Sequence, residues 1–222
     1  MKIYACFEGE TDIGALEVIL KNCVKDVHIE FNSYTHSTLM KNKTARVLSR
    51  IGKGLQKDDE KFTRKVAIRK LAILADRNGD DHIAYHQDAD RKFSEVYGAI
   101  NIEFKSFKEK GFYCLPIVPK EMTESWLLAD VKALNKLGEK NSQVSQPPLP
   151  ETLWGNESDP NSNHPYNYLV RLLERFGLSD NRDIYTKIAK EVDIEILKNR
   201  CPKSFGKFYE DMQSFITEEP TP

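Results

Sequence analysis

The sequence predicts an α/β fold in which a mostly parallel sheet is flanked by helices and is followed by a C-terminal helical extension. Short apolar segments alternate with amphipathic segments over residues 1–138, which is typical of consecutive β-α-β units. After residue 166 the apolar side chains recur only at helical spacing. Hydrophobic residues make up 40% of the 222-residue chain, which is enough to fill a substantial core.

The first β-α-β unit is expected at the N-terminus. The apolar segment KIYACFE at 2–8 predicts a strand. In the next segment, 11–23, apolar side chains recur every three or four positions, which predicts a helix that Thr11 or Asp12 can cap. VHIEFNSY at 27–34 then predicts a second strand.

A strongly basic segment follows the second strand. Residues 41–70 contain eleven Lys or Arg against three acidic residues, so this segment carries about +8 in a chain whose net charge is −1. We expect a basic helical insertion at about 36–76, with two helices around Gly52 and Gly54 and the second over 58–75. Such a block favours nucleic acid as a partner, and the alternative is a solvated helical face. The residues expected to bind nucleic acid are Arg46, Arg50, Arg64, Lys65, Arg69 and Lys70.

The alternation of strands and helices continues after the basic segment. IAYHQDAD at 83–90 and FYCLPIVP at 112–119 predict the third and fourth strands. Helices are expected at about 92–110 and 123–138. On the third strand, we expect His86 to be a packed residue rather than a general base.

The sheet domain is expected to end at residue 138. Residues 139–165 are rich in Pro, Asn and Ser and predict a long loop, in which an exposed Trp154 would indicate a partner surface. Residues 166–218 predict a C-terminal helical region. No run approaches 18 apolar residues, and the four cysteines lack metal-binding spacing. We therefore expect a cytoplasmic protein with no membrane segment and no structural zinc.

Acidic residues end two of the predicted strands. Glu8 ends the first, and Asp88 and Asp90 end the third, where positions i and i+2 of an extended segment point to the same side. Asp12 lies on the first turn of the helix after Glu8. Ligands of α/β sheets bind beyond the carboxyl ends of the strands, and clustered oxygen donors suit Mg²⁺ or Mn²⁺. Alternatively, Asp12 and Asp90 only cap the helices that follow them.

These acidic segments resemble the signature of the TOPRIM domain, the fold shared by topoisomerases, bacterial primases and OLD-type nucleases. EGETD at 8–12 is similar to its EGxxD motif, and DAD at 88–90 is similar to its DxD pair. PKEMTESWLLAD at 119–130 resembles a helix of stand-alone TOPRIM-like proteins that are encoded beside ABC-type ATPases in bacterial anti-phage operons. The resemblance covers about residues 1–135.

The resemblance implies roles for individual residues of this chain. A first Mg²⁺ or Mn²⁺ ion would be held by Glu8, Asp12, Asp88 and Asp90. Glu124, which precedes the tryptophan of the later helix, matches an acid that helps to hold a second ion. A late lysine near the scissile phosphate would be Lys203 or Lys207. The catalytic set expected is therefore Glu8, Asp88, Asp90 and Lys203.

The function implied is that of a metal-dependent nuclease, the effector of an anti-phage system with an ATPase partner. One alternative is a nucleotidyl transferase or a phosphohydrolase of small esters, against which the basic segment argues, because a small substrate does not need so many positive charges. The other is a regulatory or toxin-like subunit that binds the ATPase without catalysis. The chain contains no GxxxxGK[ST] loop, so the ATPase would be a separate protein. A homo-oligomer is left open.

Overall fold

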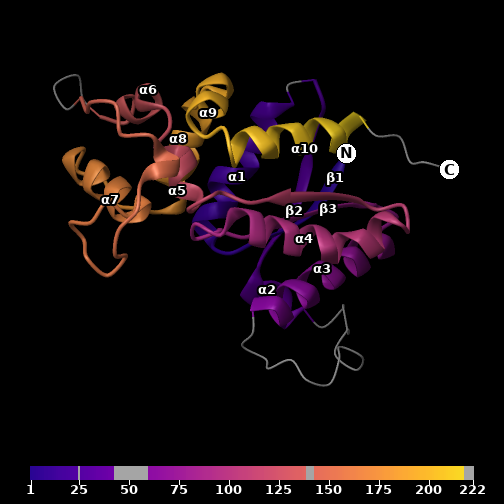
Figure 1. Cartoon of the computed structure of the whole chain (residues 1–222). Coiled ribbons are helices and arrows are strands. Elements are labelled where there is room, and N and C mark those ends of the chain that lie inside the picture. The colour runs from indigo at the N-terminus through magenta and orange to yellow at the C-terminus, as the bar shows by residue number, and fades with distance from the viewer. Residues whose placement is uncertain (25, 43–59, 139–142, 218–222) are drawn as a thin grey trace.

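The computed structural model describes residues 1–24, 26–42, 60–138 and 143–217, and its centre is a four-stranded parallel sheet (Figure 1). The strands are β1 (Lys2–Phe7), β2 (Glu30–Thr35), β3 (His82–His86) and β4 (Tyr113–Ile117), in the order β2-β1-β3-β4. Cys6 pairs with Tyr85, and His86 pairs with Ile117, so the carboxyl ends of β1, β3 and β4 lie level. The predicted fold class is confirmed.

One face of the sheet is covered by α3 (Glu60–Arg77) and α4 (Phe93–Lys108), and α2 (His36–Lys41) lies beyond the end of β2 (Figure 1). Alternate residues of the strands point to this face. Tyr4 and Ile83, for example, are buried with Ile68 of α3 and Phe104 of α4.

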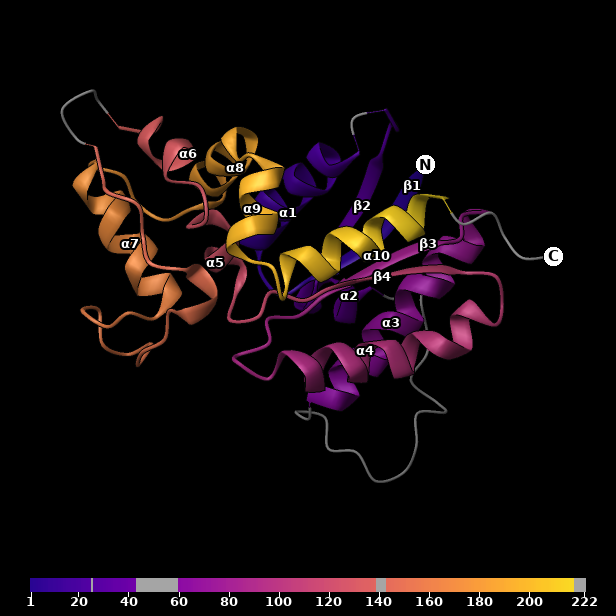
Figure 2. The same cartoon turned by 45° about the horizontal axis from the view of Figure 1, so that its top comes forward.

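The opposite face is covered by α1 (Glu10–Cys23) and α10 (Phe205–Thr217), while α8 (Arg182–Glu191) and α9 (Ile194–Arg200) pack against α1 (Figure 2). Residues of α8 and α10 share one core with β1 and α1, so the C-terminal helices pack directly on the sheet domain. A Cβ added at Gly14 of α1 would lie 2.4 Å from Oγ1 of Thr186, so this glycine allows α8 to pack closely. Among the described helices, none combines the length and apolar character that crossing a bilayer requires.

Several predicted boundaries differ from the structure. The helix expected over 123–138 is two short helices, α5 (Thr123–Leu127) and α6 (Val131–Asn135), because the side chain of Asp130 caps α6 by accepting from the amides of Lys132 and Ala133. The predicted loop contains a short 3₁₀ helix, η1 (Pro150–Thr152), and α7 (Pro165–Arg175) follows it. The predicted C-terminal helical region also contains α8 and α9, which the sequence pattern did not indicate as separate helices. Of the two helices expected around Gly52 and Gly54, the first lies outside the described residues, and the second, expected over 58–75, is α3.

Candidate functional site

The carboxyl ends of β1 and β3 are neighbours in the sheet, and each is followed by a carboxylate. Glu8 follows β1 directly, and Asp88 lies two residues beyond β3. The amide of Asp88 donates a hydrogen bond to Oε2 of Glu8 at 3.4 Å. The structure therefore brings together these two sequence-predicted residues, at the edge where α/β sheets bind their ligands.

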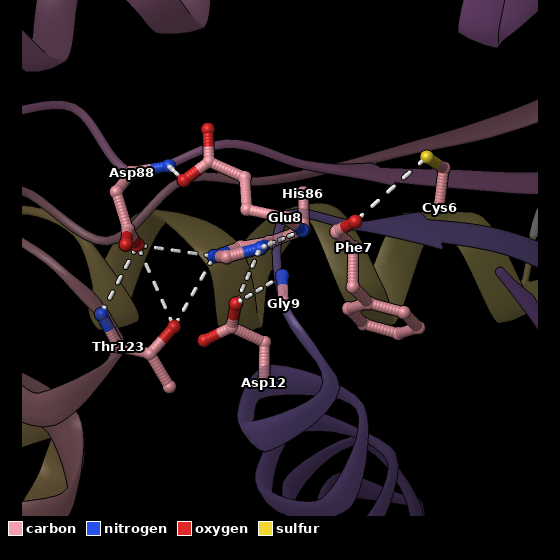
Figure 3. A network of polar contacts seen from close by, with 8 residues as sticks. All are labelled: Cys6, Phe7, Glu8, Gly9, Asp12, His86, Asp88 and Thr123. Atoms are coloured by element: carbon pink, nitrogen blue, oxygen red, sulfur yellow. Dashed lines mark hydrogen bonds and ion pairs between the residues drawn. The ribbon is translucent and has the colours of Figure 1, made fainter. Parts of the chain in front are cut away.

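The ring of His86, the last residue of β3, lies between the carboxylates of Asp88 and Asp12 (Figure 3). It is fully buried, and its Nδ1 accepts from the amide of Glu8 at 3.4 Å. Its Nε2 lies 3.1 Å from Oδ1 of Asp88, and its Nδ1 lies 3.9 Å from Oδ2 of Asp12. Because Nδ1 is an acceptor, we assign the ring proton to Nε2, which donates it to Asp88. His86 is packed, as the sequence predicts, but its contact with three site residues was missed.

Thr123, the first residue of α5, is a second hydrogen-bond partner of Asp88 that the sequence did not predict. Its amide donates to Oδ1 of Asp88 at 3.1 Å, and its hydroxyl lies 3.5 Å from the same oxygen and 3.2 Å from Nε2 of His86. Oδ1 of Asp88 thus accepts from several donors on two elements. Such contacts fix the orientation of a carboxylate, and they can only be found from the folded arrangement.

Glu124 follows Thr123 and is 6% exposed. Its Oε1 accepts a hydrogen bond from the hydroxyl of Tyr185 in α8 at 2.8 Å. Burial, together with the negative charges of Asp88 and Asp12, raises the pKa of Glu124 to about 8. The resemblance assigned Glu124 to the site, and the structure places it within electrostatic range of two other predicted residues.

Asp88 and Glu8 also hold their protons more tightly than usual. Burial, and then the charges of Asp12 and Asp90, raise the pKa of Asp88 well above its ordinary value. Partial desolvation by the surrounding protein, and then the charge of Asp88, also raise the pKa of Glu8. Because Glu8 is exposed at the rim of the site, water screens its charge and weakens this effect. The cluster therefore carries unfavourable carboxylate–carboxylate interactions.

Asp12 has the helix-capping contact that was the alternative to metal binding. Its Oδ2 accepts from the amide of Gly9 at 2.8 Å, at the start of α1. Asp12 is 7% exposed and also faces His86, so its carboxylate lies in the cluster while it caps the helix. The two interpretations are compatible, because a carboxylate has several acceptor positions.

Asp90 does not have the geometry that the sequence predicted. The strand expected over 83–90 ends at His86, and Asp90 has a φ of 43°, in the left-handed region. It therefore does not alternate with Asp88 on one extended segment, and its amide instead donates to the carbonyl oxygen of Glu121. The residue that precedes α4 is Lys92, so Asp90 does not cap that helix either. Asp90 is an exposed residue at the rim of the site.

Neither candidate lysine is shown to interact with the acids. Lys203 is exposed, and its amide donates to the side chain of Glu151. Lys207 of α10 forms an ion pair with Asp211 at 2.7 Å. In the part of the chain that the structure describes, the basic side-chain nitrogen atoms within 4.0 Å of the carboxylates of Asp12 and Asp88 are those of the His86 ring.

The basic segment is less exposed than its composition suggested. Lys70 is 2% exposed, and its Nζ donates to the carbonyl oxygens of Leu39, Met40 and Asn42 at the end of α2. Arg64 is 8% exposed and donates to Oε1 of Gln87 at 3.2 Å. These two cations are used inside the fold, so the prediction that they form part of an exposed basic surface is wrong.

The other four residues predicted to bind nucleic acid are not buried in this way or lie outside the described residues. Lys65 and Arg69 are partly exposed on α3. Arg46 and Arg50 lie outside the described residues. The described part of the basic segment thus has fewer cationic side chains available for a surface contact than its Lys and Arg content suggests.

The acid cluster suits a divalent cation in its chemistry. Glu8, Asp88 and Glu124 are oxygen donors, and Asp88 raises the pKa of both glutamates, a repulsion that a cation would relieve. Within the described ranges, no three His, Cys, Asp or Glu side chains already lie close enough to coordinate one ion. Binding would therefore require side-chain movement, for which the exposed Glu8 has the most freedom.

Comparison with known proteins adds a family match. A family model described as "Domain of unknown function (DUF4276)" matches residues 7–213. The matched range runs from the end of β1 into α10 and so includes the whole acid cluster. No curated protein and no solved structure matches the chain.

Proposed function

The chain belongs to the DUF4276 family, and we propose that it is a metal-dependent nuclease that cleaves phosphodiester bonds at the acid cluster. The observation that carries the proposal is the convergence of Glu8, Asp12 and Asp88 around His86, at the carboxyl edge of a parallel sheet, with Glu124 within electrostatic range of Asp88 and Asp12. Acids that are buried together and raise one another's pKa are typical of functional sites. Their spacing in the sequence also resembles that of the TOPRIM-like signature.

Each residue of the cluster has a distinct part in this proposal. Glu8, Asp12, Asp88 and Glu124 would hold Mg²⁺ or Mn²⁺, which supplies Lewis-acid activation of a phosphate oxygen and of water. His86 and Thr123 position Asp88 by donating to its Oδ1. Tyr185 positions Glu124 through its hydroxyl. Asp90, at the rim, adds negative charge that would favour cation entry.

The burial of Arg64 and Lys70 favours a second candidate, a metal-dependent hydrolase or nucleotidyl transferase of small phosphate esters. The main argument against that candidate was the surplus of positive charge, and the fold uses part of this charge internally. We retain the nuclease as the first proposal because Arg91 and Lys92, which directly follow the Asp88–Asp90 segment, are exposed cations that could contact a polymer. We further propose, from the resemblance, that a separate ABC-type ATPase is the partner in anti-phage defence.

The test is cleavage by purified full-length protein with Mg²⁺ or Mn²⁺. The substrates are plasmid DNA, a single-stranded oligonucleotide, tRNA and bis(p-nitrophenyl) phosphate. We expect Asp88→Asn to reduce cleavage at least about 100-fold, because Asn keeps the acceptor for His86 but loses the charge that binds a cation. Asp76→Asn, on the exposed end of α3, is the matched control and should keep full activity.

The outcomes separate the candidates. Cleavage of polymers that is lost with EDTA and with Asp88→Asn supports a nuclease. Turnover of the small diester alone supports the second candidate. Full activity of Asp88→Asn, with its fold verified by circular dichroism, would show that the acid cluster is structural.

A further inference from the structure

Trp154 is a large apolar side chain that the fold keeps at the surface. It is 41% exposed, whereas the other tryptophan, Trp126, is fully buried. The guanidinium carbon of Arg91 lies 4.9 Å from the centre of its ring, and the ring of His164 packs against it at 5.7 Å. We propose that Trp154 and Arg91 form a stacking site for an unpaired nucleobase, so that the substrate binds as a single strand. This inference rests on the proposed nuclease function and names its substrate class.

The stacking site lies beside the acid cluster. Arg91 is three residues after Asp88, and its amide donates to the carbonyl oxygen of Lys120, three residues before Thr123. The Nζ of Lys120 donates to the carbonyl oxygen of Glu151, three residues before Trp154. The segments after β3, after β4 and around η1 therefore meet at this point. A base on Trp154 would place its neighbouring phosphates near Asp88.

The segment that carries Trp154 is held in place by buried side chains. Glu151 is 5% exposed, and its carboxylate accepts from the amides of Lys203 and Ser204. Asn167 of α7 donates from its side-chain amide to the backbone carbonyl oxygens of residues 156, 157 and 159. These contacts fix an otherwise irregular segment, so Trp154 is presented at the surface by an ordered frame.

Two further features mark this place as more than ordinary surface. Arg91 has a φ of 71°, a backbone conformation that is unfavourable for a non-glycine residue and persists where the surroundings impose it. Beside the indole, His164 is 5% exposed, and its Nδ1 is a buried atom with no hydrogen-bond partner. Unpaired buried polar atoms are few in folded proteins, and a ligand bound at this place would be one source of a partner.

The chemistry of an indole beside a guanidinium suits a nucleobase. Bases stack on aromatic and guanidinium planes whatever their sequence, because every base has a π face. In a duplex, neighbouring bases already cover both faces of each base, so the duplex interior offers no free face. Arg91, Lys92 and Lys203 are exposed cations around this place and can contact the phosphates of the same strand. These features favour a single strand over a duplex.

The position of the two tryptophans allows a direct test. Because Trp126 is buried, quenching of tryptophan emission by an added oligonucleotide reports on Trp154. We use full-length Asp88→Asn protein, so that binding is separated from cleavage, with a 20-nucleotide poly(dT) and a 20-base-pair duplex. We expect poly(dT) to quench the emission and the duplex to quench it much less.

Binding of fluorescently labelled poly(dT), measured by anisotropy, tests the two residues. Trp154→Ala should weaken binding about 10- to 100-fold, Trp154→Phe by less, and Arg91→Gln about 10-fold. Ile102→Ala is the matched control, since Ile102 is an exposed apolar residue of α4, and it should bind as its parent does. Unquenched emission, or equal binding by Trp154→Ala and its parent, would overturn the inference. A Trp154-dependent interaction with the ATPase in place of poly(dT) would also overturn it.

The failure of this inference can be told apart from failure of the proposed function. Trp154-dependent binding of poly(dT), with no cleavage by wild-type protein, would support the stacking site and refute the nuclease. Metal-dependent cleavage that is the same in wild type and Trp154→Ala would support the nuclease and refute the stacking site.

Discussion

Replacing Glu124 with Gln should make the metal-free protein more stable at high pH and leave its stability unchanged at low pH. Glu124 is buried, and its pKa is raised from the usual 4.5 to about 8. Between these values the unfolded chain is ionised at this position and the folded chain is protonated. The stability that protonated Glu124 contributes is therefore fully present below pH 4.5 and is lost as the pH rises through about 8.

The size of the effect follows from the rise in pKa. One pH unit corresponds to about 1.4 kcal/mol, so the rise from 4.5 to about 8 is worth at most about 5 kcal/mol. Asp88 shares the interaction, so we expect Glu124→Gln to gain about 2–4 kcal/mol over wild type at pH 9 and close to nothing at pH 4.5. The Gln carbonyl can still accept the hydrogen bond from Tyr185.

The assay is urea unfolding in EDTA at pH 4.5, 7 and 9, with the emission of the buried Trp126 as the signal. Glu174→Gln, on an exposed position of α7, is the control and should follow wild type at every pH. Adding Mn²⁺ at pH 8 should stabilise wild type more than Glu124→Gln, since a cation favours the ionised carboxylate. A difference between Glu124→Gln and wild type that is the same at all three pH values would refute the reasoning.

Three further changes test other parts of the structure. Lys70→Met should lower the free energy of unfolding by about 2–4 kcal/mol, because three carbonyl oxygens lose their charged donor, whereas Lys105→Met at an exposed position should change it by less than about 0.5 kcal/mol in the same urea titration. Gly14→Ala should cost about 1–3 kcal/mol because its Cβ would overlap α8, whereas Gly98→Ala, with open space around it, should gain up to about 1 kcal/mol; equal effects would contradict the close packing. His86→Asn should raise the Mn²⁺ concentration for half-maximal cleavage about tenfold, because Asp88 loses the hydrogen bond donated by the His86 Nε2–H. An unchanged metal dependence would show that His86 is only a core residue.

The sequence predicts the sheet well because the relevant signals are local. The sequence predicts strands at 2–8, 27–34, 83–90 and 112–119, and the structure has a strand within each range or overlapping it. The prediction succeeds because these apolar runs are short and flanked by polar turns. Their parallel pairing follows from the helices that separate them. The same argument brings Glu8 and Asp88 to one edge, and the structure has them in contact.

The parts that were missed depend on contacts between distant segments. His86 and Thr123 carry no sequence signal for their shared hydrogen bonds with Asp88, because they meet only when α5 packs beside β3. The left-handed backbone conformation of Asp90 was not predicted, because apolar and polar residues alternate in this segment as they do in a strand. Charge composition likewise does not show which cations are buried, so Lys70 was read as part of a surface.

The C-terminal helices are a structural support of the acid cluster. Tyr185 of α8 donates to Glu124, and Ser204 accepts from the indole of Trp126, two residues later in the same short helix. Because Gly14 has no side chain, α1 can also pack closely against Thr186 and Arg182 of α8. The first turn of α1 carries Asp12. The helices after residue 165 thus hold α1 and α5 against each other. Repulsion among the carboxylates acts to separate these two elements, and the packing of α8 opposes it, so the region that looks like an extension in the sequence is needed to keep the acids together.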